Sequence, residues 1–229
     1  MTTVVGREQA YTTPRPDVSA LVPDTALTVL DLGCSNGALG ASLRQAVPGR
    51  RVWGIEIDPE FARVAGTRLD EVLCADLGRL DWTHVFPGTQ FDCIIMADVL
   101  EHLADPAATL QAVRQRLRPG GCLVVSLPNI RHISALYAIY VGGRFPQRQR
   151  GIFDSTHLRW FTLADAHQLL ATQQLEVRRS SYSLRLGDQG GGRMNRWLNR
   201  LPPAVQGVAP LREFLTYQFC LQAVPRQPG

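Results

Sequence analysis

The segment "VLDLGCSNGALG" (residues 29–40) decides the fold, because it joins an apolar strand to a helix through a glycine-rich turn. The run "LTVLDLG" (27–33) is typical of a buried strand, and after the turn Leu39, Leu43 and Ala46 recur at helical spacing. Glycine lets a ligand approach the backbone closely, so the turn predicts a binding site at the carboxyl edge of a parallel sheet.

Apolar runs and helical patterns continue to alternate along the chain, which predicts an α/β sheet with parallel strands. Further strands are expected over 51–57, 71–77, 91–99, 122–128, 175–184 and 214–224. Asp58 and Asp105, each followed by proline, open two helices. A looser region predicts a helix over roughly 131–142 and another over 163–173, which Thr162 and Asp165 begin as a capping box.

The composition indicates a globular protein with a real core: 45% of the 229 residues are hydrophobic and 19% are charged. No apolar run reaches the roughly 18 residues that span a bilayer, and the N-terminus lacks a secretory pattern. The five cysteines are odd in number and form no CxxC pair. They fit reduced thiols, so we expect a cytoplasmic protein.

Nucleic-acid binding is disfavoured by the charge pattern. The net charge is only +4, and the basic stretches 144–150 and 193–200 are short. The "SLPN" sequence (126–129) also differs from the Pro-Pro-aromatic motif that grips a flipped base. We therefore expect no nucleic-acid partner.

Glu56 ends the second strand, where a carboxylate can accept hydrogen bonds from both hydroxyls of a ribose. Together with Gly33, Gly37 and Gly40 it indicates a nucleoside cofactor, without separating nicotinamide enzymes from others. Three later segments distinguish between these classes of enzyme: "CAD" (74–76), "FDCIIMADVLEHL" (91–103) and "LRPGGCLVVSLPN" (117–129). In this order and spacing, residues 27–130 resemble the class I S-adenosylmethionine-dependent methyltransferases.

The resemblance implies a Rossmann-like sheet, mostly parallel with an antiparallel last strand, and an inserted cap. We divide the chain into a lead-in or lid (1–26), a cofactor-binding core (27–183) with an acceptor-side segment (131–162), an insertion or cap (184–212), and a final strand and tail (213–229). In the lead-in, Tyr11 and Arg15 could close over the cofactor.

The resemblance also implies a cofactor role for individual residues. Asp31, Gly33 and Gly37 would shape the pocket for the methionine half, and Glu56 would hold the ribose. Cys34 and Ser35 belong to the same loop, where Ser35 replaces the usual middle glycine, and Ile57 follows Glu56. Asp76 and Leu77 would flank the adenine, Asp98 would lie beneath the sulfonium, and His102 would pack under the cofactor.

A narrower likeness comes from "LPNIRH" (127–132), "GRF" (143–145), "GIFDSTHLRWFT" (151–162) and "YQF" (217–219). These resemble a bacterial methyltransferase subgroup that is associated with glycosyltransferases and cell-surface polysaccharide assembly. The resemblance implies a glycan or sugar hydroxyl as the acceptor.

A sugar hydroxyl is a poor nucleophile at neutral pH, so a general base would assist transfer. His157 is the first candidate, with Asp154 to orient its ring, and His132 is the second. The alternative is that Asp154 and His157 only join the loop to the sheet edge. No set of His, Asp and Glu stands out as a magnesium or zinc site, so we predict no metal.

Residues 193–201 carry an apolar helical face bordered by arginines. This face predicts a peripheral membrane contact, or docking on the domain or on a second copy in a homodimer. The leading functional hypothesis is O-methylation of a glycan hydroxyl. The alternatives are a small aromatic or lipid-like acceptor, such as a quinone precursor, and a non-catalytic cofactor-binding partner protein.

Overall fold

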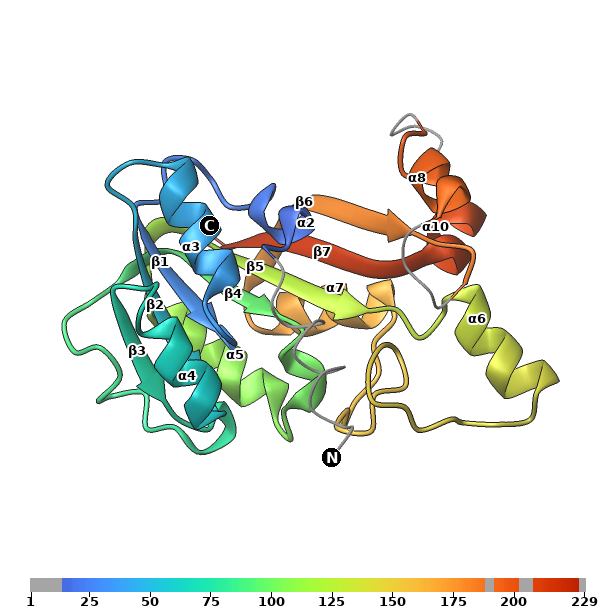
Figure 1. The fold of residues 1–229 in the computed structure, drawn as a ribbon, viewed down its shortest axis with the longest axis horizontal. Helices are drawn as coiled ribbons and strands as arrows, with labels where there is room; N and C mark the ends of the chain where they lie inside the picture. The colour runs from blue at the N-terminus through green and yellow to red at the C-terminus, as the bar shows by residue number, and fades with distance from the viewer. Residues whose placement is uncertain (1–13, 188–191, 202–207, 227–229) are drawn as a thin grey trace.

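The computed structural model describes residues 14–187, 192–201 and 208–226. Within them, seven strands form one sheet in the order β3-β2-β1-β4-β5-β7-β6 (Figure 1). The strands are β1 (Thr28–Leu32), β2 (Arg51–Glu56), β3 (Glu71–Cys74), β4 (Phe91–Ala97), β5 (Leu117–Pro128), β6 (Leu175–Leu184) and β7 (Thr216–Pro225). The strands from β3 to β5 pair in parallel, and β7 is antiparallel to both β5 and β6. The expected class, mostly parallel with an antiparallel last strand, is confirmed.

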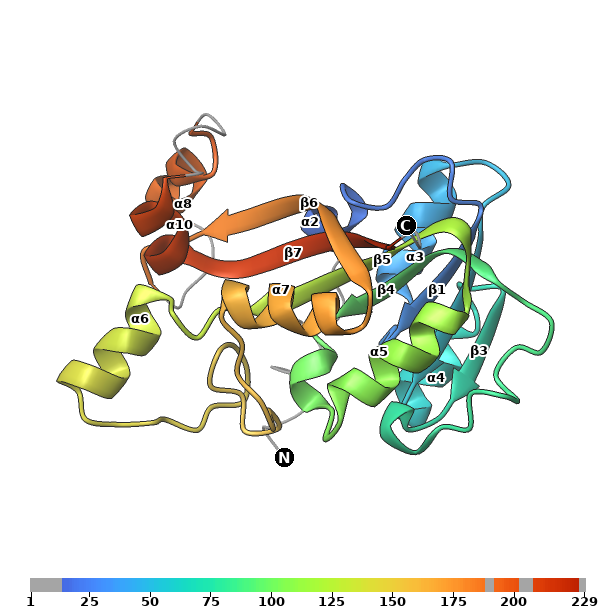
Figure 2. The same ribbon diagram turned by 180° about the vertical axis from the view of Figure 1, so that it is seen from behind.

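Helices cover both faces of the sheet (Figures 1 and 2). One face packs against α2 (Pro16–Ser19), α3 (Ala38–Ala46) and α4 (Pro59–Ala65), and the other against α5 (Pro106–Gln115) and α7 (Leu163–Thr172). The apolar residues predicted on the first helix, Leu39 and Leu43, are buried against Val29 and Val52 of the sheet. Because both faces are covered, ligands can reach the sheet only at its edges.

The helix starts expected from the sequence are present. Asp58 accepts hydrogen bonds from the N–H groups of Glu60 (2.9 Å) and Phe61 (3.1 Å). Thr162 and Asp165 form a reciprocal capping box at the start of α7. These caps satisfy backbone donors that would otherwise lack partners, which explains why the helices begin there.

The strand expected over 122–128, β5, begins earlier, at Leu117. Two elements beside the predicted site also differ from the prediction. The third strand ends at Cys74 instead of residue 77, because Asp76 accepts a hydrogen bond from the Gly78 N–H (2.9 Å) and starts a 3₁₀ helix, η1 (Leu77–Arg79). The helix expected over 131–142 is split into α6 (Ile133–Leu136) and a π-helical turn, η3 (Tyr137–Val141). Both deviations lie beside the carboxyl edge, where the predicted site is located.

The acceptor-side segment 131–162 extends beyond the sheet and carries α6 (Figure 2). The cap contributes α8 (Arg193–Leu198) and α10 (Ala209–Leu215), which stand beside the end of β6 and the start of β7 (Figure 1). Within the described residues, no helix is long and apolar enough to span a membrane.

Candidate active site

The glycine-rich loop after β1 is fixed by backbone hydrogen bonds. The N–H groups of Gly33 and Cys34 both donate to the Ile55 carbonyl oxygen, at 2.8 and 3.1 Å. Gly33 and Gly37 have φ angles of 71° and 76°, and Ser35 has a φ of 49°. Ser35 therefore adopts the left-handed conformation that glycine favours, and the serine at this position is accommodated in the turn.

Glu56 is buried beside this loop and tied to it. Its Oε2 accepts from the Ser35 N–H (2.7 Å) and its Oε1 from the Asp58 N–H (3.0 Å). Each carboxylate oxygen has a second lone pair, so the group can still accept from two ligand hydroxyls. This geometry fits the expected ribose contact.

Asp31 is a buried carboxylate at the end of β1, and its Oδ2 has no hydrogen-bond partner. Burial raises the pKa of Asp31 to about 7, and the nearby charge of Glu56 adds to the effect, while Arg15 opposes it. The Ser35 hydroxyl is also buried without a partner. Orphaned polar atoms of this kind fit a polar ligand such as the amino-acid half of S-adenosylmethionine.

The expected adenine contacts lie along the same edge. Ile57 is 64% exposed, which is unusual for a large aliphatic side chain and leaves it available to a flat ring. Leu77 is partly buried at the start of η1. Asp76 is exposed and caps η1, with its carboxylate 3.7 Å from the Arg79 guanidinium. Its capping role is thus visible, and the adenine contact remains a proposal.

Asp98 follows β4 with a left-handed φ of 58°. Its carboxylate accepts hydrogen bonds from Arg15 of the lead-in and from Gln218 of β7. Arg15 also donates to the Ser126 hydroxyl (2.7 Å). The lead-in therefore reaches the rim at the position expected for the sulfonium, whereas Tyr11 lies outside the described residues.

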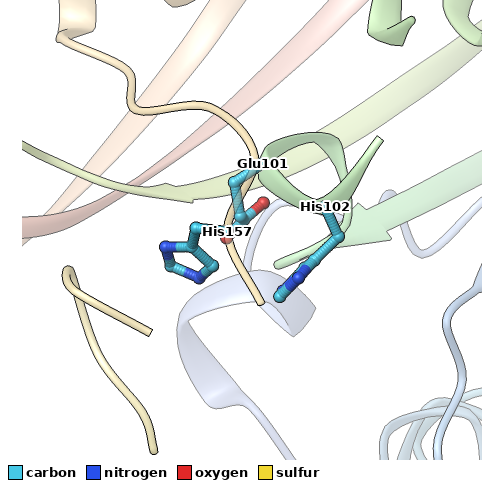
Figure 3. Close-up of side chains that lie close together, drawn as sticks. All are labelled: Glu101, His102 and His157. Atoms are coloured by element: carbon cyan, nitrogen blue, oxygen red, sulfur yellow. The ribbon is translucent and has the colours of Figure 1, made fainter. Parts of the chain in front are cut away.

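Next to Asp98, three side chains converge from two parts of the chain (Figure 3). Glu101 and His102 lie on the 3₁₀ helix η2 (Leu100–His102), and His157 comes from the acceptor-side segment. One ligand-capable atom of each lies within 4.8 Å of the others. The pKa of His157 is lowered, first by burial and then by the neighbouring His102, which favours a neutral ring.

The expected pairing of Asp154 with His157 is wrong in this structure. The Nδ1 of His157 contacts the Ile152 carbonyl oxygen (3.2 Å). Asp154 instead accepts from the N–H (2.9 Å) and the hydroxyl (2.6 Å) of Thr156, whose hydroxyl contacts His102 Nδ1 (3.2 Å). Asp154 therefore positions His102 through Thr156. His102 itself contacts the acceptor-side segment, through Thr156 and the His157 ring.

The geometry of His132 argues against its role as a second base. Its ring is fully buried, with Nδ1 accepting from the Ser134 N–H (3.2 Å) and Nε2 2.9 Å from the Arg185 carbonyl oxygen. An imidazole that accepts at Nδ1 donates at Nε2, so both nitrogens are occupied. His132 caps α6 and connects it to the cap.

Glu101 is the residue that the sequence reasoning missed. It is 1% exposed, and neither carboxylate oxygen has a hydrogen-bond partner among the described residues. Burial, with the nearby charge of Asp98, raises its pKa well above the ordinary range. The available signal was the Glu101-His102 pair shortly after a strand end, since both side chains can bind a metal ion or a proton. The expectation of no metal site did not foresee this grouping.

Comparison with known proteins shows the family of the chain. A family model described as a methyltransferase domain matches residues 7–180. A ubiquinone biosynthesis O-methyltransferase of Xylella fastidiosa is 34% identical over 134 residues, 57% of this chain and 53% of that protein. A trans-aconitate 2-methyltransferase of Azoarcus is 35% identical over 113 residues, 49% and 44% of the two chains. The chain thus spans about half the length of these curated relatives.

Solved structures share the fold. The magnesium protoporphyrin IX methyltransferase of Synechocystis with bound SAH has a TM-score of 0.59 at 20% identity, covering 96% of this chain and 84% of that one. An S-adenosylmethionine-dependent methyltransferase of Mesorhizobium loti has a TM-score of 0.60 at 15% identity, covering 91% and 95%.

The family match and the fold together identify an S-adenosylmethionine-dependent methyltransferase of class I. The chain belongs to the methyltransferase domain family that matches residues 7–180, and its cofactor is S-adenosylmethionine.

Proposed function

We propose that the protein transfers a methyl group from S-adenosylmethionine to a hydroxyl of a small, aromatic or lipid-like acceptor. The observation that carries this proposal is an aromatic cluster beside His157. The Phe145 ring packs edge-on against Phe153 and Trp160, at centroid distances of 5.0 and 4.9 Å. Phe145 and Trp160 are exposed, at 51% and 38%, and Trp160 Nε1 donates to the same Ile152 oxygen that His157 contacts.

The sequence favoured a glycan acceptor first and a small aromatic acceptor second. The names of the relatives support a small-molecule acceptor, because one is named for ubiquinone biosynthesis and the other for trans-aconitate, a small carboxylic acid. One observation favours a polar acceptor: a cavity of about 280 Å³ borders Gln218, the partner of Asp98, and its lining includes Asp17, Ser181 and Asn199. A sugar hydroxyl therefore stays as the second candidate.

Chemically, the donor supplies an activated methyl group on a sulfonium, and the chain must hold the acceptor in line and away from water. Glu56, Asp31 and the glycine-rich loop would bind and orient the donor. Asp98 would place a negative charge near the sulfonium. The acceptor hydroxyl would then lie over His157, where its proton must leave before or during transfer.

The cap contributes a proposal about partners. Met194 and Trp197 of α8 are exposed, at 55% and 58%, whereas Leu198 is buried. The exposed side of 193–201 supports either a peripheral membrane contact or a contact with a second copy of the chain. A lipid-like acceptor would be consistent with the first.

The decisive experiment is incubation of the purified protein with isotope-labelled S-adenosylmethionine and two acceptor panels, one of hydroxylated aromatic compounds and one of surface polysaccharide fractions. Mass spectrometry identifies what gains a methyl group. We expect labelling of an aromatic hydroxyl. Labelling confined to the polysaccharide fractions would favour the glycan candidate. Donor binding without transfer to any acceptor would favour a non-catalytic cofactor-binding partner.

A further inference from the structure

We propose that Glu101, His102 and His157 form a binding site for a divalent transition-metal ion on the acceptor side of the rim. The three side chains offer ligand atoms within 4.8 Å of one another. The Glu101 carboxylate lies between the two imidazole rings (Figure 3). A cation in this space would need only small side-chain rotations to reach ordinary bond lengths of about 2.0–2.2 Å.

The two rings are held as metal-binding imidazoles usually are. The Nδ1 of His102 contacts the carbonyl and hydroxyl oxygens of Thr156, both at 3.2 Å. The Thr156 hydroxyl donates its own proton to Asp154, so it must accept at this contact. His157 Nδ1 meets the Ile152 carbonyl in the same way. In both rings Nδ1 therefore carries the proton, and Nε2 keeps a free lone pair, as in the outer-shell arrangement that orients metal ligands.

Glu101 supplies an independent observation. Its carboxylate is buried and both oxygens are without partners within the described part of the chain. A buried carboxylate without donors is costly unless a cation or a proton neutralises it. A proton shared between Glu101 and one imidazole would satisfy only two of the groups, whereas the cluster presents three lone-pair donors. A divalent cation satisfies all three at once.

The ligand set indicates which cations fit. Two imidazoles and one carboxylate suit Zn²⁺, Mn²⁺, Fe²⁺ or Co²⁺, whereas Ca²⁺ and Mg²⁺ prefer sites built of oxygen atoms. Three protein ligands leave coordination positions open, which is typical of catalytic metal sites. His102 and His157 are only partly buried, so an ion and an acceptor can both enter.

The chemical role rests on the proposed function, although the site itself does not. An acceptor hydroxyl bound at an open position would lose its proton to water more readily, because the cation stabilises the oxyanion. The oxygen then forms its bond to the methyl carbon while the carbon–sulfur bond breaks, and the sulfonium becomes a neutral thioether. His157 acts here as a ligand and not as the proton acceptor.

The first measurement is metal binding by the full chain, without an affinity tag and after treatment with a chelator. Titration with Co²⁺ is followed by visible absorption, and titration with Zn²⁺ by calorimetry. We expect one saturable equivalent and the absorption bands of cobalt bound to nitrogen and oxygen. Absence of saturable binding would overturn the proposal.

Variants locate the ion. Glu101→Gln and His157→Ala should each weaken Zn²⁺ binding at least 100-fold, and Thr156→Val should weaken it about 10- to 100-fold by freeing the His102 ring. His84→Ala is the matched control, because His84 is exposed and pairs with Asp81 at 2.9 Å, as an imidazole beside a carboxylate outside the site. Equal losses in His84→Ala and Glu101→Gln, or no loss in Glu101→Gln, would contradict the assignment.

A last comparison separates this proposal from the proposed function. In the chelated protein, calorimetry should show unchanged affinity for S-adenosylmethionine, and methyl transfer should fall at least 100-fold and return with Zn²⁺ or Mn²⁺. Full transfer in the chelated protein would overturn the metal role and leave the methyltransferase function intact. Failure of the untreated protein to transfer any methyl group would count against the proposed function instead.

Discussion

Two buried glutamates on the same rim differ in one respect. Glu56 is 8% exposed, and each of its oxygens receives a backbone N–H. Glu101 is 1% exposed, and its oxygens receive none within the described residues. The fold stabilises the Glu56 carboxylate before any ligand binds, whereas the Glu101 carboxylate needs a partner that binds from outside. The Glu56 contact on the cofactor side is therefore preorganised, whereas the state of Glu101 on the acceptor side depends on what binds there.

The largest effect should come from the acceptor side. His157→Ala removes an imidazole beside Glu101 and His102, and with it a ligand of the proposed metal ion, so methyl transfer should fall at least 100-fold. Affinity for S-adenosylmethionine should stay within twofold, because the ring touches none of the loop residues that fix Glu56. Single-turnover rates and calorimetry measure the two quantities. Retained transfer would return His157 to a structural role and remove the contrast between the two sides.

The second test substitutes each of the two glutamates separately. Glu56→Ala should lower the affinity for S-adenosylmethionine about 100-fold or more, because the ribose hydroxyls lose a charged hydrogen-bond acceptor. The N–H groups of Ser35 and Asp58 also lose the carboxylate to which they donate. Glu101→Gln should change donor affinity less than twofold. Calorimetry with donor alone measures both. Similar losses in the two variants would mean that Glu101 also binds the donor.

Asp31 gives a pH test of the cofactor side. Its folded-state pKa of about 7 lies above the ordinary value of 3.8, so the native state holds a proton that the unfolded state releases within this range. The contribution of Asp31 to stability is therefore full below about pH 4 and is lost as the pH rises through 7.

Asp31→Asn removes this pH dependence. Relative to the wild type, its free energy of unfolding should increase by roughly 2–4 kcal/mol between pH 4 and pH 8. Urea denaturation across that range measures the difference. A difference that does not vary with pH would show that Asp31 is solvated or paired, and would contradict its buried position without a partner for Oδ2.

The smallest effect concerns the ion pair between Arg15 of the lead-in and Asp98, which lies next to the Glu101 cluster. Arg15 neutralises Asp98 in this structure, and a guanidinium there disfavours a cationic ligand more than a neutral one. Arg15→Gln should raise the affinity for S-adenosylmethionine relative to S-adenosylhomocysteine a few-fold. Calorimetry with both ligands gives the ratio. An unchanged ratio would mean that Arg15 moves away from Asp98 when the donor binds.

The same contrast explains what the sequence could predict. Asp58, Asp105 and the Thr162 capping box act on backbone groups within a few residues, so local pattern is sufficient to find them. Glu56 could also be predicted from the sequence, because it ends a strand whose position follows from its run of apolar residues. The antiparallel last strand came from the family resemblance, whereas the order of the strands was not predicted.

The acceptor side was less predictable because its contacts join distant segments. Thr156 and His102 are 54 positions apart, and His132 and Arg185 are 53 apart. No local spacing distinguishes a histidine that caps a helix from one that faces a cluster. For the same reason, the sequence-based prediction paired Asp154 with His157 instead of His102 and gave Glu101 no role.

The position of β7 has a consequence for how the molecule is made. This strand follows both β5 and β6 along the chain, yet it lies between them, and its Gln218 holds Asp98. During synthesis β6 has no neighbouring strand until β7 has emerged from the ribosome. The parallel half of the sheet can form early, but the rim acquires its final shape only when the ribosome has nearly finished the described chain. Cotranslational cofactor binding should therefore be late, even though the glycine-rich loop is synthesised first.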